Sequence, residues 1–180
     1  MAAERQWNAG VRAFSQDRPH ATLVTGEGGG DVNADKLRTV EDWVSYYRHE
    51  FGLPVTERGG FVMLPVTAQV AVVHLPVACA EKVRRALHQQ HRDGPMLARQ
   101  IRWSFLAEPD SRPGDQVMEV LNRLDIGIPA VGSAVLLPTG LGRWTREGCH
   151  WVTPPARDSK LPPLSAIVTT ALAVGSGSED

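Results

Sequence analysis

The sequence has too few cysteines to form the sites that usually depend on them. Its 180 residues include only Cys79 and Cys149, which lie far apart in the chain. Zinc-binding and redox motifs place two thiols within about four residues of each other. The two cysteines therefore exclude such a motif, and their scarcity indicates a reducing compartment.

Long apolar runs are also missing. No run approaches the roughly 18 residues that a membrane-spanning helix needs, and the first five residues, MAAER, lack the apolar core of a secretory signal. We therefore expect a cytoplasmic protein that makes no membrane contact.

The sequence also has few lysines and almost no net charge. The basic residues are arginines except for Lys36, Lys82 and Lys160, and the formal net charge is −1. A chain with this charge has no general attraction to a polyanion, so any contact with nucleic acid must come from a local basic face. Hydrophobic residues make up 42% of the chain and exclude a wholly disordered protein.

The glycine-rich segment over residues 25–31 divides the chain. Its glycines are not followed by the Lys-Ser/Thr pair of a phosphate-binding P-loop, and they do not lie between a strand and a helix, so a linker is favoured. We expect a flexible N-terminal arm or lead-in over 1–35, a single domain over 36–174 and a polar tail over 175–180.

Apolar periodicity predicts the elements of this domain. Helices are expected from Thr39, whose hydroxyl can cap the first turn, to residue 51, then around 79–87, 117–124 and 164–172. Strands are expected over 61–64, 70–75, 101–106, 134–137 and 149–153, the first two as a hairpin or one bent strand. This order predicts an α+β fold with a mostly antiparallel central sheet and helices packed on it.

Three patterns that contain histidine could each have a structural role or belong to a binding, metal or catalytic site. His74 lies in an apolar strand, so it is either a hydrogen-bonded core residue or part of a site. His88 and His91 have no third ligand nearby, which favours a solvated helix end over a metal site. Cys149 and His150 point to opposite faces of a strand and cannot act as nucleophile and base.

Arginines gather in two parts of the chain. These groups either bind phosphates or form an ordinary solvated surface together with neighbouring acids. The first group spans one expected helix and the next strand, and the second lies in the last third: Arg84, Arg85, Arg92, Arg99 and Arg102; Arg143, Arg146, Arg157 and Lys160.

An ordered series of short motifs carries a family resemblance. The motifs are FVMLP at 61–65, VVHLP at 72–76, IRWSFL at 101–106, LDI at 124–126, AVLLPTG at 134–140 and HWVTPP at 150–155. In this order and spacing, residues 61–173 resemble the N-terminal domain of bifunctional DNA primase/polymerase proteins, in particular the small stand-alone members. The resemblance implies a fold of the archaeo-eukaryotic primase type.

The resemblance also implies where a site would lie. Active members carry an Asp-x-Asp pair that holds two divalent metals, and the matching positions here are His74 and Pro76. Arg102 stands where the family has a nucleotide-contacting histidine, Asp125 matches a third acid, and Thr139 lies in the segment that replaces Pro-Pro-Ser. The implied remnant cleft is therefore His74, Arg102, Asp125 and Thr139, with no catalytic residue, metal or cofactor.

The leading hypothesis from these residues is a degenerate, non-catalytic relative that binds a nucleotide or nucleic acid. Its phosphate-binding residues are expected to be Arg102 with Arg143 or Arg146. One alternative is a regulatory or adaptor protein that docks a protein partner through Trp144, Trp151 and Pro154. Another is nucleotidyl transfer by a different metal arrangement, against which the lack of clustered acids on the expected strands argues.

Overall fold

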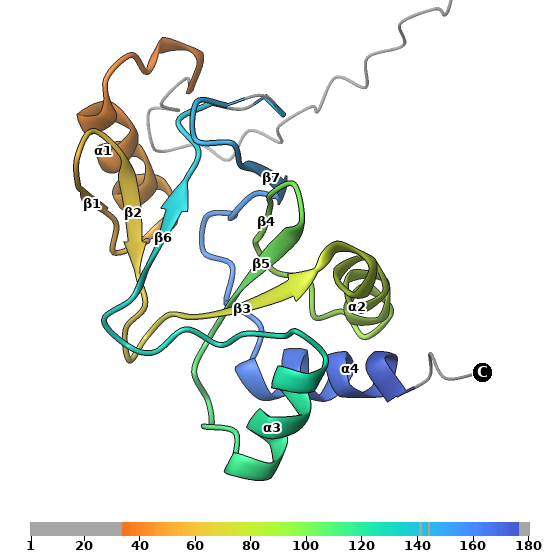
Figure 1. Cartoon of the computed structure of the whole chain (residues 1–180). Coiled ribbons are helices and arrows are strands. Elements are labelled where there is room, and N and C mark those ends of the chain that lie inside the picture. Colours follow the sequence, from red (N-terminus) through yellow and green to blue (C-terminus); the bar gives the residue numbers. More distant parts are fainter. Residues whose placement is uncertain (1–33, 141, 144, 177–180) are drawn as a thin grey trace, which may run out of the picture. The chain divides into compact units, whose positions relative to one another are not determined.

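The computed structural model describes residues 34–140, 142–143 and 145–176, which form four α-helices and seven strands (Figure 1). The expected arm over 1–35 lies almost wholly outside these residues, and its last two positions begin a short 3-10 helix, Ala34–Lys36. No helix in the described part of the chain is long and apolar enough to cross a membrane.

A three-stranded antiparallel sheet carries the first helix. Its strand order is β1 (Thr56–Glu57), β2 (Val62–Pro65) and β6 (Ala134–Leu137), and helix α1 (Val40–Phe51) contacts β1 and β2. The α1 helix begins as expected, because the Thr39 hydroxyl accepts from the Asp42 backbone N–H while the Asp42 carboxylate accepts from the Thr39 N–H.

A four-stranded antiparallel sheet forms the second layer. Its order is β3 (Ala71–Pro76), β5 (Arg102–Ala107), β4 (Met96–Ala98) and β7 (His150–Thr153). Helices α2 (Val77–Gln89) and α4 (Leu164–Ser176) pack side by side and contact β3, and α3 (Asp115–Arg123) precedes the segment that returns to the first sheet (Figure 1).

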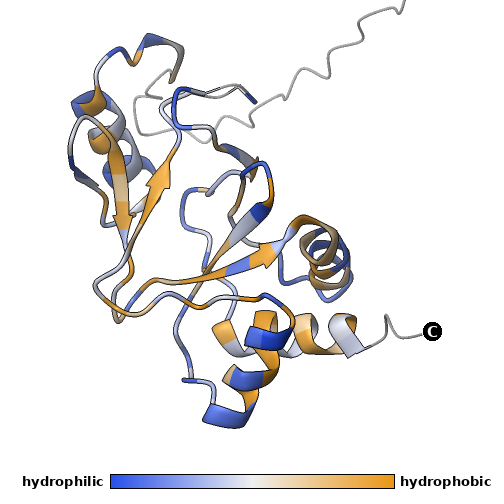
Figure 2. Cartoon of the chain, in the orientation of Figure 1, coloured by the Kyte–Doolittle hydropathy of each residue, from blue (hydrophilic) through white to orange (hydrophobic). Residues whose placement is uncertain are grey.

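Strands β3 and β4 and the second half of β5 are buried on both faces of the four-stranded sheet, which explains why they are largely apolar. Val73 and Phe105 face a core formed with α2, α3 and α4, whereas Val72, Leu97 and Leu106 face a second core formed with α1 and the three-stranded sheet. Continuous apolar strands are typical of a sheet covered on both sides. Figure 2 shows apolar residues concentrated in β3 of this sheet and in β2 and β6 of the three-stranded sheet.

These observations confirm the α+β class and correct several details. The strands are divided between two sheets rather than gathered in one, and β2 and β3 do not pair with each other. The Thr67 hydroxyl accepts from the backbone N–H groups of Gln69 and Val70, and this turn carries the chain from one sheet to the other. Helix α4 continues through Gly175 and Ser176, which were expected in the polar tail.

The hydroxyl of Tyr47 links the two sheets. Tyr47 is 1% exposed on α1; its hydroxyl donates to the Pro138 carbonyl at 2.8 Å and accepts from the Trp151 indole N–H at 2.9 Å. Pro138 follows β6 of the first sheet and Trp151 belongs to β7 of the second. Burial raises the pKa of Tyr47, so the hydroxyl keeps the proton that this chain of bonds requires.

We predict that Tyr47→Phe destabilises the protein by about 1–3 kcal/mol, because it leaves a buried carbonyl and a partly buried indole N–H without this partner. Urea denaturation measures the free energy of unfolding. Tyr46→Phe, on the same helix but less buried, is the matched control and should change it by less than about 0.5 kcal/mol. Equal losses in the two variants would contradict the linking role of the Tyr47 hydroxyl.

Candidate functional site

His74 is a hydrogen-bonded strand residue. It lies on β3 opposite Ser104 of β5, and its Nδ1 is 2.8 Å from the Ser104 hydroxyl. Its backbone exchanges two hydrogen bonds with Gly127, at 2.8 and 2.9 Å. Strand β3 is at the edge of its sheet, and the Gly127 segment covers that edge at His74.

Neighbouring charges and burial keep His74 neutral. Burial lowers its pKa below the ordinary value of 6.5, and the Arg102 and Arg99 guanidinium groups lower it further. Its Nδ1 is already bonded to a serine that is 2% exposed, and one imidazole does not replace the carboxylate oxygens with which an acid would hold a pair of Mg²⁺ ions. Pro76, the other position implied by the Asp-x-Asp resemblance, precedes the first residue of α2.

Asp125 ends a helix and engages Arg102. It follows α3 in the left-handed conformation, with φ of 58°, and its N–H donates to Asn122 while the Ile126 N–H donates to Leu121. This is the Schellman arrangement of a helix C-terminus. The Arg102 guanidinium donates to both the carbonyl, at 2.7 Å, and the carboxylate of Asp125.

Thr139 contacts a different acid, which the sequence did not reveal. Its hydroxyl donates to the Glu147 carboxylate at 2.5 Å, and Glu147 is only 9% exposed. Burial acts to raise the pKa of Glu147, but hydrogen bonds from Thr139 and from backbone N–H groups outweigh it and hold the pKa below its ordinary value. No sequence pattern marks Glu147, because it is a lone acid in a loop of varied residues.

The three arginines expected to bind phosphate have separate surroundings. Arg102 is engaged by Asp125, and Arg146 donates to the Gly60 carbonyl at 2.8 Å while it lies 4.7 Å from the Phe61 ring centroid. Arg143 is exposed and lines a groove of about 560 Å³ at one end of the four-stranded sheet. Of the three, Arg143 is the one that lines this groove.

This cationic groove gathers residues from α2, the β4–β5 turn, the loop after β6, and β7. Its charged members are Arg84, Arg99, Arg143 and one acid, Glu81. Arg99 and Arg143 are exposed, whereas Arg84 is half-buried. The Arg84 Nε is shielded from solvent and has no acceptor within the described residues, which costs about 1–3 kcal/mol.

The floor of the cationic groove is a row of paired residues across three strands. Ala98 of β4 lies opposite Trp103 of β5 on one side and opposite His150 of β7 on the other. Directly paired residues present their side chains on the same face of a sheet. The small Ala98 side chain therefore lies between an indole and an imidazole, and all three residues line the groove.

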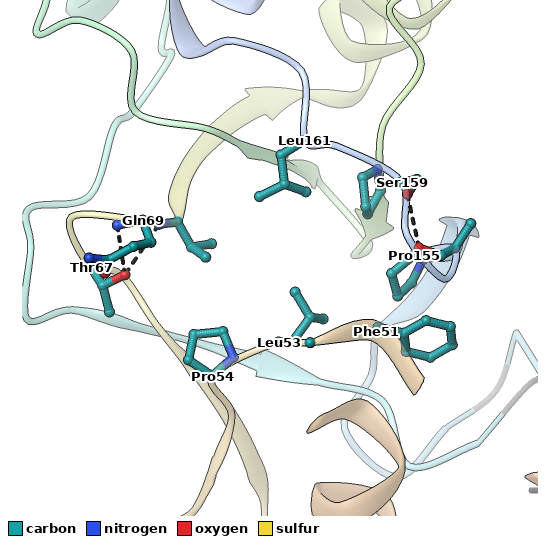
Figure 3. A pocket seen from close by; sticks show the side chains of 12 residues that line it. Phe51, Leu53, Pro54, Thr67, Gln69, Pro155, Ser159 and Leu161 are labelled. Atoms are coloured by element: carbon teal, nitrogen blue, oxygen red, sulfur yellow. Dashed lines mark hydrogen bonds between the residues drawn. The ribbon is translucent and has the colours of Figure 1, made fainter. Parts of the chain in front are cut away.

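The residues expected to dock a partner are less available than the sequence suggested. Trp144 lies outside the described residues, and Trp151 is half-buried with its indole N–H bonded to Tyr47. Pro154 is exposed. An apolar hollow of about 400 Å³ lies nearby, and Figure 3 shows that its lining includes Phe51 and Leu53 on one side and Leu161 on the other.

Within the described part of the chain, neither Cys149 with His150 nor a group of acids forms a second candidate site. Cys149 is fully buried, its thiol lies 3.6 Å from the Leu136 carbonyl oxygen, and burial raises its pKa to about 11, so the thiol stays protonated at neutral pH. Among the described residues, no three His, Cys, Asp or Glu side chains gather as a metal-binding group.

Comparisons with known proteins add no relative. No family model, curated protein or solved structure gives a significant match to this chain.

We predict that His74 makes the protein less stable in mild acid. The folded state holds the neutral form, so between its lowered pKa and the ordinary value of 6.5 the unfolded chain binds more protons. The stabilisation is complete above about pH 6.5 and is lost as the pH falls through the folded pKa.

Unfolding free energies of the parent and of His74→Gln, measured by urea denaturation from pH 7.5 to 5, test this prediction. The parent should lose stability over this range more steeply than the variant. His49→Gln, at an exposed position on α1, is the control and should follow the parent. Parallel curves for the parent and His74→Gln would contradict the lowered pKa.

Proposed function

We propose that this chain is a non-catalytic nucleic-acid-binding protein, built on a primase/polymerase-like domain that has lost its metal-binding acids. The observation that carries the proposal is the cationic groove, whose lining includes three arginines, one histidine and two tryptophans but a single acid. Guanidinium groups suit phosphate oxygens, and aromatic rings suit bases.

The charge distribution supports a local binding surface. The whole chain has a formal net charge of −1, yet the charged members of the groove are three arginines and one glutamate. Binding that depends on such a face is sensitive to salt, because each contact with a phosphate releases counterions. We therefore propose that Arg84, Arg99 and Arg143 bind the phosphates. Arg102 and Arg146 are excluded because each already donates hydrogen bonds to groups within this chain.

The residues at the implied metal positions do not suit catalysis. His74 uses Nδ1 for Ser104, and Pro76 has no side-chain ligand atom. Asp125, the acid that the resemblance retains, is engaged by Arg102 at the end of α3. These residues offer no set of oxygen ligands for the two divalent ions that primer synthesis requires.

A regulatory or adaptor role is the second candidate, favoured by the apolar hollow. The hollow is lined by Phe51, Leu53, Pro54, Val70 and Leu161, which suit an apolar segment of a protein partner better than a charged strand. This candidate predicts that the arginines of the cationic groove have no effect on partner binding.

We predict that the protein binds single-stranded DNA at low salt. Fluorescence anisotropy with a labelled oligothymidine should give a slope of log affinity against log salt of about −2, at about 0.7 for each of three phosphate contacts. The variant Arg84→Ala, Arg99→Ala, Arg143→Ala should bind at least about tenfold more weakly.

Arg112→Ala is the control, because Arg112 is exposed but does not line the cationic groove. It should bind almost as tightly as the parent. Failure of the parent to bind at low salt, or binding by the triple variant equal to that of the parent, would reject the nucleic-acid proposal. The adaptor candidate would then take its place.

We also predict that the protein neither makes nor extends a primer. A gel assay with a primed template, nucleoside triphosphates and Mg²⁺ or Mn²⁺ should show no product above the enzyme-free background. The double variant His74→Asp, Pro76→Asp should remain inactive, because Arg102 and Asp125 engage each other and a histidine is missing at position 102. Metal-dependent incorporation by the parent would overturn the non-catalytic assignment.

A further inference from the structure

We infer that the cationic groove takes one unpaired base of a single-stranded nucleic acid over Ala98, between the side chains of Trp103 and His150. The inference rests on the proposed function and deepens it, because it assigns the strand form that is bound and the residues that contact the base. Phosphate contacts alone would not distinguish a single strand from a duplex.

The spacing of the floor residues leaves room for one base. Trp103, Ala98 and His150 are consecutive partners across β5, β4 and β7, so Trp103 and His150 are two strand spacings apart. Neighbouring strands lie about 4.8 Å apart, which separates these two residues by roughly 10 Å. A flat ring needs about 3.5–4 Å to the atoms on each of its faces, so this separation admits one base.

The residue between Trp103 and His150 is small. Ala98 has one methyl group and lines the cationic groove, whose volume is about 560 Å³. A larger side chain at this position would fill the space between the indole and the imidazole. The hollow therefore depends on the alanine.

Positively charged and polar groups are arranged around the floor of the cationic groove. Arg84 belongs to the α2 wall, Arg99 to the β4–β5 turn and Arg143 to the loop that follows β6, so positive groups come from several sides of the aromatic floor. Gln100 adds an amide that can donate to and accept from the edge of a base. A phosphate beside α2 would also offer an acceptor to the Arg84 guanidinium if it turned toward the groove, since its Nε has none within the described residues.

A single strand fits this arrangement better than a duplex. Bases of a duplex are stacked and paired, whereas an unpaired base can leave the strand and stack on an aromatic side chain. The flanking phosphates of the same strand then face the arginines. Every base has a flat face, so this mode of binding does not depend on sequence.

The test compares three probes of the same length, about 12 nucleotides: oligothymidine, an oligomer that is abasic at every position, and a duplex. The full-length protein should bind oligothymidine roughly five- to a hundredfold more tightly than the abasic oligomer, since stacking of one base is removed. The duplex should bind no more tightly than the abasic oligomer. Both single strands should keep the same salt dependence.

Variants of the floor test the assigned residues. Ala98→Leu should lower the affinity for oligothymidine to that of the abasic oligomer and leave the abasic affinity unchanged, whereas Ala98→Ser should behave as the parent. Because Ala98→Leu can disturb the sheet, His150→Ala provides a second test at a half-buried position. This variant should reduce the difference in affinity between oligothymidine and the abasic oligomer. Trp103→Phe should keep much of the difference in affinity between oligothymidine and the abasic oligomer, and Trp103→Leu should remove this difference. Thermal melting checks that each variant is folded.

The outcomes separate this inference from the function on which it rests. Equal affinities of the parent for oligothymidine and the abasic oligomer, both reduced by the arginine variant, would overturn the base site and leave the nucleic-acid proposal in place. Tighter binding of the duplex would also overturn the base site. Binding of none of the probes would reject both.

Discussion

Burial of the four-stranded sheet on both faces is the constraint on which the rest of the structure depends. Its strands have one core toward α2, α3 and α4 and another toward α1 and the three-stranded sheet. A polar side chain within such a sheet must therefore find a partner or lie where a core ends. His74 has such a partner, because it is bonded to Ser104. Trp103 and His150 instead lie where a core ends, beside the cationic groove.

The same constraint explains how the arginines are used. Where a core ends, a guanidinium group can be fixed by the protein or left to solvent, and the chain does both. Arg102 holds the end of α3 through Asp125, and Arg146 covers Phe61 and the Gly60 carbonyl. Arg99 and Arg143 instead remain exposed beside an aromatic floor. Whether an arginine is bound within the protein or available to a ligand therefore depends more on its position relative to the sheet than on its neighbours in the sequence.

Much of the fold follows from local patterns in the sequence. The capping residues of α1, the apolar stripe of α3 and the run of β6 are strong signals, and each element forms where it was expected. The strands β1 and β4 were missed because elements of two or three residues have no measurable period. The division into two sheets was missed because apolar strands carry no information about which neighbour they pair with.

The candidate site was less accessible to sequence reasoning for a related reason. Arg84, Arg99 and Arg143 were noticed as basic residues, but their convergence depends on pairings between β4, β5 and β7 that no local pattern encodes. Asp125 stood out as an acid in a family-like motif, whereas its backbone shows a helix-terminating residue in the left-handed conformation. Glu147 went unnoticed because its burial is produced by the fold around Thr139.

The pairing of His74 with Gly127 has a consequence for how copies of this chain can meet. An edge strand normally offers free N–H and C=O groups to which a strand of another molecule can add. On β3, Gly127 occupies both backbone groups of His74, and Pro76 at the strand end has no N–H to offer. A second chain could not extend the sheet along the whole of β3 without displacing this segment. At His74 and Pro76 the free edge of β3 therefore offers no N–H group to which a strand of another molecule could pair.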